Sequence, residues 1–322
     1  MGRSIVQFLL EQALPIIHPD CNFFGGVFLA YGFLFPIAVS FFIHYALFMS
    51  YLLPDLRIVP LRSVVIQEYF DSGISRDLLR KIEEDGVLMN PPIVAAFGSR
   101  YLHLDGANRL TTLAELGYPH AIVQVVDYFD PRSVELKSWC HVSAVDERRF
   151  MRLIRGLPGV SVDLLKVGRD RHVSLEKRTV CLVVFADGKA CRVWGNEELV
   201  SQVSLMNKVV DFYKHLVIRD QEDVFFDEET LAEFFRRHQG KNVVLFFPTF
   251  RPQDVLNVVR AGEKFPPGIT RHIIRFRALR VNFPLAVLKS PRSLAWKRDY
   301  LKRFMEKIEW RVYEEPVVMG ER

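Results

Sequence analysis

Six consecutive residues, Leu104-Asp105-Gly106-Ala107-Asn108-Arg109, have the types and spacing of a turn that binds phosphate. A short β-rich run at 101–104 precedes them, apolar residues at helical spacing follow, and Gly117 suits the end of that helix. Gly106 lets the backbone approach an anion closely, the free amides of a helix N-terminus favour negative charge, and Arg109 is a forked, always-charged donor. The alternative is a tight turn followed by a solvated arginine.

The elements that must position this turn form an α+β pattern. Residues 56–130 predict a small domain with strands at 57–61, 93–96, 101–104 and 122–128 and a helix from Ser75 as N-cap to a stop at Gly86. Residues 131–290 alternate β runs at 180–185 and 243–247 with helical patterns at 198–216, 228–238 and 253–261, which predicts a second α+β domain.

The two ends of the chain differ from this pattern. Residues 1–55 read as an amphipathic helix followed by a hydrophobic segment, because no Asp, Glu, Lys or Arg occurs from Cys21 to Pro54. A spanning helix needs about 20 apolar residues, so residues 22–53 predict a membrane anchor. The excess of Lys and Arg after the segment places the catalytic part in the cytoplasm. A buried core helix or helical pair is the alternative.

Residues 291–322 predict a basic amphipathic tail, with Leu301, Phe304 and Met305 on one helical face. Such a helix suits a membrane surface or an oligomer contact, while ordinary packing with solvated charge is the simpler interpretation.

Composition sets broad bounds. The chain has 322 residues, enough for two domains, and 49% of them are hydrophobic, which excludes general disorder. A net charge of +5 favours anionic partners such as nucleotides, nucleic acid or lipid headgroups without choosing among them. The cysteines form no CxxC pair and no metal-binding spacing, which indicates reduced thiols: Cys21, Cys140, Cys181 and Cys191.

The order of a strand, a Glu-bearing loop, a helix, a strand, a hairpin and an Asp-Gly-x-x-Arg helix resembles the ParB/sulfiredoxin superfamily, and more closely the free serine kinases, which convert L-serine to O-phosphoserine. Three separated motifs carry the resemblance over residues 57 to about 285. They are residues 104–109 with 125–130, then Ser138-Trp139, and last residues 260–265 with 269–272.

The resemblance implies a kinase mechanism and its residues. Glu68 would be the catalytic carboxylate that activates the serine hydroxyl, and Asp105 a second catalytic carboxylate that binds Mg²⁺ or the acceptor hydroxyl. Mg²⁺ and a phosphate donor, ATP or ADP, would be the cofactors. Three residues would bind the nucleotide phosphates: Gly106, Asn108 and Arg109. Four others would bind the acceptor: Trp139, Thr270, Arg271 and His272.

The chain departs from the kinase pattern at specific positions. Ala107 and Asn108 stand where these kinases usually carry two histidines, and Asn can donate a hydrogen bond to phosphate but cannot take up a proton. A substrate-contacting lysine of the kinases falls at Pro248, where Lys241 or Arg251 could compensate. Sulfiredoxin activity is excluded because its reactive cysteine would fall at Ala107.

The sequence therefore predicts a membrane-tethered, nucleotide-dependent kinase acting on free L-serine or a similar small hydroxylated metabolite. One alternative is a ParB-like nucleotide-dependent DNA-binding or nuclease protein, but no helix-turn-helix array follows the Asp-Gly-x-x-Arg unit. The other is a catalytically weak, membrane-associated nucleotide or metabolite sensor. The sequence contains no Walker A or kinase glycine-rich loop, and it does not predict an oligomeric state.

Overall fold

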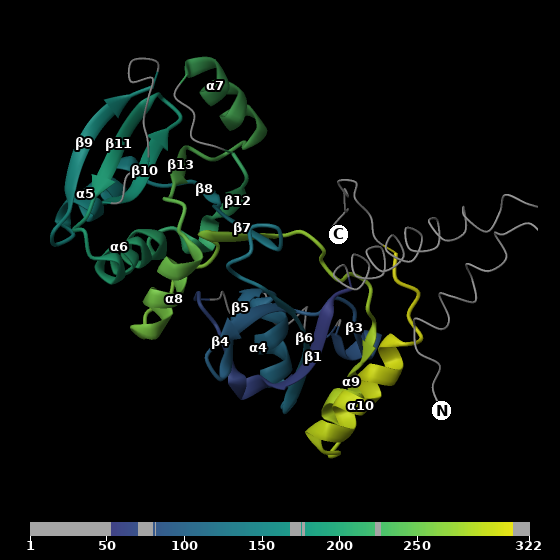
Figure 1. Ribbon diagram of the computed structural model, residues 1–322. Helices are drawn as coiled ribbons and strands as arrows, with labels where there is room; N and C mark the ends of the chain where they lie inside the picture. The colour runs from purple at the N-terminus through teal and green to yellow at the C-terminus, as the bar shows by residue number, and fades with distance from the viewer. Residues whose placement is uncertain are drawn as a thin grey trace, which may run out of the picture. The chain divides into compact units, whose positions relative to one another are not determined.

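The structure, a computed structural model, describes residues 53–69, 80, 82–167, 175, 178–222 and 227–311. Asp55–Ile308 form one compact unit of the chain, and Figure 1 shows its helices and strands. The N-cap expected at Ser75 lies outside the described residues. The helix stop expected at Gly86 is observed, because Gly86 has a φ of 63° and its amide donates to the carbonyl of Ile82.

A five-stranded sheet forms the first layer, in the order β1-β6-β4-β5-β2. Four of the strands overlap the runs expected from the sequence, which alternate or accumulate apolar residues that reach the core, whereas β2 was not expected. The five strands are β1 (Asp55–Pro60), β2 (Val64–Val65), β4 (Ile93–Phe97), β5 (Arg100–Asp105) and β6 (His120–Val126).

The turn after β5 is built as the sequence predicts. Gly106 is the N-cap of helix α4 (Ala107–Glu115) with a φ of 92°, a left-handed conformation that favours glycine. Gly117, also left-handed with a φ of 72°, follows the last turn of the helix. The Asp105–Arg109 segment thus joins the end of a buried strand to the start of a helix.

A six-stranded sheet lies in the second half of the unit, in the order β12-β8-β13-β10-β11-β9. Helices cover both faces: Val183 and Leu245 share one apolar core with α5, α6 and α8, while Leu182 and Val244 pack with Leu231 of α7 (Figure 1). The strands are β8 (Cys140–Ser143), β9 (Ser161–Lys166), β10 (Thr179–Phe185), β11 (Lys189–Trp194), β12 (Ile218–Asp220) and β13 (Val243–Phe246). The helices are α5 (Glu147–Gly156), α6 (Leu199–Asp211), α7 (Glu228–Arg237) and α8 (Pro252–Arg260).

A two-stranded antiparallel sheet connects the part of the unit that contains the first sheet with the part that contains the second. Strand β7 (Val134–Ser138), which leads from the first sheet toward the second, pairs with β14 (Thr270–Ile274), which leads back. After β14 the chain forms β15 (Phe283–Pro284), which pairs with the earlier strand β3 (Val87–Leu88). Two helices follow, α9 (Leu285–Lys289) and α10 (Leu294–Met305).

Helix α10 packs against the first sheet, next to β1. Its Lys297 is fully buried: Nζ donates to the carbonyl of Leu288 at 2.6 Å and lies 3.2 Å from Nδ1 of His120. Leu301 is buried on the same helix. Part of the predicted basic tail is therefore packed helix rather than a wholly solvated surface, and the predicted domain boundaries stay predictions.

The expectation of an N-terminal membrane-spanning helix, and of the membrane-anchored location inferred from it, is corrected. Within the part of the chain that the structure describes, no helix is long and apolar enough to cross a membrane. The longest of these helices, α6, has 13 residues, whereas a span needs about 20. The segment on which the expectation rested, 22–53, lies outside the described residues except for its last residue. The α+β class itself is observed.

Candidate functional site

Glu68 lies on a short extended segment after β2 that is tied to a residue almost 200 positions later. The amide of Phe265 donates to the carbonyl of Gln67, and the amide of Tyr69 donates to the carbonyl of Phe265, each at 2.9 Å. These bonds form an isolated parallel bridge between Glu68 and Phe265. We call this pairing the 68–265 bridge; it places the predicted catalytic base beside the loop that enters β14.

The carboxylate of Glu68 sits in a partly buried environment that changes its acidity. Burial raises the pKa of Glu68 to about 7, and the negative charge of Asp105 acts in the same direction. The backbone amide of Gly268, which donates to Oε2 at 3.1 Å, and the positive charge of Arg219 oppose that rise in pKa. A carboxylate with this pKa can accept a proton near neutral pH.

Asp105 accepts two charged hydrogen bonds through one oxygen. Its Oδ2 receives Nη2 of Arg109 at 2.8 Å and Nη1 of Arg277 at 2.7 Å. Burial alone would raise the pKa of Asp105, but the two guanidinium groups outweigh burial and lower it. Asp105 is therefore ionised at neutral pH, and its negative charge acts on Glu68.

Arg109 folds back over the turn from which it extends. A Cβ at Gly106 would lie 2.8 Å from Nη2 of Arg109, so only glycine allows this approach. Nη1 of Arg109 also donates to the carbonyl of Asn90 at 2.6 Å. Both terminal nitrogens therefore already contact the protein, and phosphate binding by Gly106, Asn108 and Arg109 stays a prediction.

The structure divides the residues predicted to bind the acceptor between two faces of β14. Thr270 and His272 are buried, whereas Arg271, between them, is partly exposed. The hydroxyl of Thr270 accepts a hydrogen bond from Nε2 of Gln67, which places it next to the 68–265 bridge. Arg271 instead stacks on the ring of Trp139, with its Cζ 4.8 Å from the ring centroid, and donates to Gln221.

His272 is buried and its ring packs against the ring of Tyr128. The hydroxyl of Tyr128 lies 2.7 Å from Nε2 of His272, and His103 acts electrostatically on both His272 and Asp105. Burial lowers the pKa of His103 to about 4 and that of His272 to about 3, so both rings are neutral at pH 7. His272 can therefore position groups but cannot supply a positive charge to an acceptor.

Three residues that sequence analysis did not single out also lie at the site. Arg277 contacts Asp105, Arg219 lies beside Gly268, and His141 has its Nε2 2.9 Å from the carbonyl of Gly268. No local pattern marks them, because each reaches the site through pairing of distant segments. An alignment of relatives would be the signal able to find them.

The positions considered for a compensating cation are engaged by other groups. Nζ of Lys241 donates to the carbonyl of Leu216, and Arg251 pairs with Asp254 at the start of α8. The carbonyl of Pro248 accepts a hydrogen bond from the hydroxyl of Ser138. Either side chain would have to leave these contacts to take the place of a lysine at position 248.

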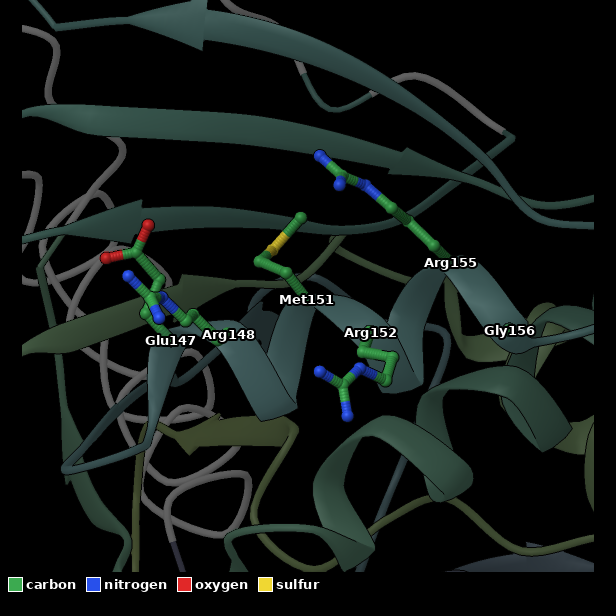
Figure 2. Close-up of a pocket in the computed structure, with 6 residues that line it drawn as sticks. All are labelled: Glu147, Arg148, Met151, Arg152, Arg155 and Gly156. Atoms are coloured by element: carbon green, nitrogen blue, oxygen red, sulfur yellow. The ribbon is translucent and has the colours of Figure 1, made fainter.

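A separate surface groove of about 640 Å³ runs along α5, away from the predicted site residues. Figure 2 shows Arg152 and Arg155 projecting to opposite sides of this helix, with Met151 on the same side as Arg155. Its lining residues are Glu147, Arg148, Met151, Arg152, Arg155 and Gly156, none of which sequence analysis predicted to act. In the described residues, no cluster of three or more His, Cys, Asp or Glu side chains could hold a metal ion.

The chain is similar in sequence to proteins named ATP-dependent L-serine kinases. No protein-family profile matches the chain. An ATP-dependent L-serine kinase of Staphylothermus marinus is 26% identical over 247 residues, which are 74% of this chain and 88% of the relative. The ATP-dependent L-serine kinase SbnI of Staphylococcus aureus is 22% identical over 279 residues, 85% of this chain and 100% of SbnI.

Solved structures share the fold. SbnI with a C-terminal truncation has a TM-score of 0.59 at 20% identity and covers 78% of this chain and 95% of that one. A free serine kinase in complex with AMP has a TM-score of 0.58 at 17% identity, covering 73% and 94%. The comparisons support the predicted class, a phosphotransferase that acts on a hydroxyl group. They also confirm the predicted resemblance to free serine kinases within the ParB/sulfiredoxin fold.

Proposed function

We propose that this protein is a nucleotide-dependent kinase that transfers phosphate to the hydroxyl of free L-serine, with Glu68 as the general base. The observation that carries the proposal is the placement of Glu68: a carboxylate with its pKa raised to about 7, held by the 68–265 bridge within electrostatic reach of Asp105. The names of the relatives supply the substrate class.

In this mechanism Glu68 accepts the proton of the serine hydroxyl as its oxygen attacks the terminal phosphorus of the nucleotide. The new bond joins serine Oγ to phosphorus, and the bond from phosphorus to the bridging oxygen breaks, with its electron pair staying on the nucleotide. Positioning and charge stabilisation account for most catalysis in such transfers. The contact from the Gly268 amide fixes one oxygen of Glu68 while the base acts.

The start of α4 is the proposed phosphate site. The free amides after Gly106 and the positive end of the helix dipole attract the phosphates, and Asn108 adds a side-chain donor. Arg109 would bind phosphate only by exchanging its contact with Asn90 or Asp105. Ala107 leaves the turn without the acid–base group that a histidine would provide there.

Asp105 fits a role in holding Mg²⁺ together with nucleotide phosphates. Its Oδ2 is engaged by two arginines, whereas Oδ1 accepts no hydrogen bond from the described residues. Mg²⁺ commonly uses one or two protein carboxylates plus substrate phosphates, so a larger cluster is not required. When bound, the ion would neutralise charge on the transferred phosphate.

The proposal is tested by measuring O-phosphoserine formation by the full chain with Mg²⁺, ATP or ADP, and a panel of hydroxyl acceptors led by L-serine. We expect Glu68→Gln to lower turnover roughly 10²- to 10⁴-fold, the range for loss of a general base. Glu115→Gln, an exposed glutamate at the end of α4, is the matched control. Nucleotide binding without turnover of any acceptor would contradict the kinase and favour a sensor.

A further inference from the structure

We propose that Arg219 binds the carboxylate of the acceptor amino acid and so selects serine over hydroxyl compounds that lack a carboxylate. This inference rests on the proposed kinase function and adds a specificity residue to the same site. Arg219 lies on β12, an edge strand of the second sheet, and no sequence motif marks it.

Arg219 is held against the backbone next to the proposed base. A Cβ placed on Gly268 would lie 1.8 Å from Nε, 2.4 Å from Cζ and 2.5 Å from Cδ of Arg219. Gly268 also has a φ of 72°, which disfavours any other residue. The space that a side chain at 268 would occupy is therefore filled by the guanidinium group.

The same peptide connects Arg219 to Glu68. The amide of Gly268 donates to Glu68 Oε2 at 3.1 Å, and its carbonyl accepts from Nε2 of His141 at 2.9 Å. A carbonyl only accepts, so His141 carries its proton on Nε2, and its Nδ1 faces the hydroxyl of Tyr213 at 3.1 Å. Arg219 thus flanks the carboxylate that would face the serine hydroxyl.

His141 does not provide a competing positive charge at this place. The ring is fully buried, and burial lowers the pKa of His141 to about 4, so it is neutral at pH 7. Its contacts with Tyr213 and Gly268 fix the ring from both sides. It therefore positions the Gly268 peptide, and the positive charge beside Glu68 comes from Arg219.

Other cations around the site are already engaged by protein groups. Arg219 differs from them, because among the described residues it forms no ion pair with a carboxylate. The engaged groups are Arg109 and Arg277 on Asp105, Arg271 on Trp139 and Gln221, Lys241 on the Leu216 carbonyl, and Arg251 on Asp254.

The chemistry of the acceptor matches this free guanidinium. Serine carries its carboxylate on the same carbon that bears the hydroxymethyl group, so the group to be recognised is close to the group to be phosphorylated. A guanidinium can bind a carboxylate through two parallel hydrogen bonds, and such charge-assisted pairs are among the strong ones. Arg219 can therefore orient serine while Glu68 accepts its proton.

The test compares L-serine with L-serinamide, which keeps the hydroxyl and amine but lacks the carboxylate. Binding is measured by calorimetry and turnover by phosphate transfer for the wild-type full chain, Arg219→Gln, Arg219→Lys and Arg236→Gln. Arg236, exposed near the end of α7, is the matched control. Thermal unfolding of each variant confirms that it is folded.

We expect the wild type to prefer L-serine over L-serinamide by roughly 10- to 100-fold, as for a charged hydrogen-bonded pair. Arg219→Gln should lose most of that preference, Arg219→Lys should restore part of it, and Arg236→Gln should keep it. An unchanged preference in Arg219→Gln would overturn the inference. Equal losses of turnover with both acceptors would also overturn it, because Arg219 would then act on the phosphate or on Glu68.

Failure of the kinase proposal gives a different result. A wild type that binds L-serine but never phosphorylates it contradicts the kinase and leaves the preference in binding as the test of Arg219. A wild type that binds no L-serine overturns both proposals.

Discussion

At the scale of single residues, the shifted acidity of Glu68 predicts how activity depends on pH. Because the base must be deprotonated and its pKa is raised to about 7, kcat/KM for L-serine should rise about tenfold per pH unit below 7 and level off above it. Initial rates between pH 5.5 and 9 measure this. A profile that is flat from pH 5.5 to 7 would mean that Glu68 is not the titrating base.

Glu68 also predicts a pH-dependent cost in stability. Its pKa is about 7 in the folded protein, above the ordinary value of 4.5, so the stability it contributes is complete below pH 4.5 and is lost as pH rises through 7. Glutamine does not titrate. As pH rises from 5 to 8, the melting temperature of Glu68→Gln should therefore increase by about 2–6 °C relative to that of the wild type.

Differential scanning calorimetry of both proteins at several pH values measures that difference. The exposed Glu115→Gln should show no pH-dependent gain over the wild type. A constant difference between Glu68→Gln and the wild type at all pH values would show that Glu68 titrates alike in the folded and unfolded chain.

At the scale of elements, the turn between β5 and α4 is held by unequal contributions of two arginines. Arg109 bonds both Asp105 and the carbonyl of Asn90, whereas Arg277 bonds Asp105. Arg109→Gln removes both contacts and should therefore cost about 2–3 kcal/mol of unfolding free energy, whereas Arg277→Gln should cost about 1 kcal/mol. Both ion pairs are partly exposed, which keeps each cost small. Urea unfolding measures both, and equal losses would contradict the assigned contacts.

Gly268, in the loop that enters β14, has a matched counterpart in Gly240, which lies between α7 and β13. Gly268 and Gly240 have similar φ values of 72° and 76°, but a Cβ at Gly240 meets nothing within 4 Å, whereas one at Gly268 meets Arg219. Both alanine variants should lose about 1–2 kcal/mol from backbone strain. Gly268→Ala should in addition displace Arg219 and weaken L-serine binding, which calorimetry detects. Equal serine binding by both variants would contradict the close approach of Arg219.

Patterns of residues close together in the sequence predicted most helices and strands, but they predicted only part of the candidate site. Helix α4, its left-handed Gly106 and the stop at Gly117 follow from residues adjacent in the chain. The contacts of Glu68 with Gly268, and of Asp105 with Arg277, join segments more than 170 positions apart, which no periodicity encodes. The split of Thr270 and Arg271 between two faces follows from strand alternation, but only once β14 is known to be a strand.

The prediction for the hydrophobic N-terminal segment was wrong for a different reason. Its composition alone suggested a membrane span, yet the described helices include none able to cross a membrane. The segment itself lies outside the described residues except for Leu53, and apolar length alone does not identify the surroundings of a segment.

At the scale of the whole molecule, the compact unit Asp55–Ile308 contains every residue proposed to act. A shortened chain of residues 55–308 should therefore unfold cooperatively and keep kcat/KM for L-serine within about threefold of the full chain, since it retains all contacts of the site. Circular dichroism melting and phosphate-transfer rates measure this. Loss of activity in a folded short chain would place a required group outside the unit.

The 68–265 bridge has a consequence for the protein as it is being synthesised. The proposed base is synthesised some 200 residues before Phe265, the residue that pairs with it. Contacts of such sequence separation form slowly, and a nascent chain gains them only after the later segment emerges from the ribosome. A growing chain would thus contain its turn and its glutamate before the segment that completes the site, and activity could begin only after residues 265–277 have been synthesised.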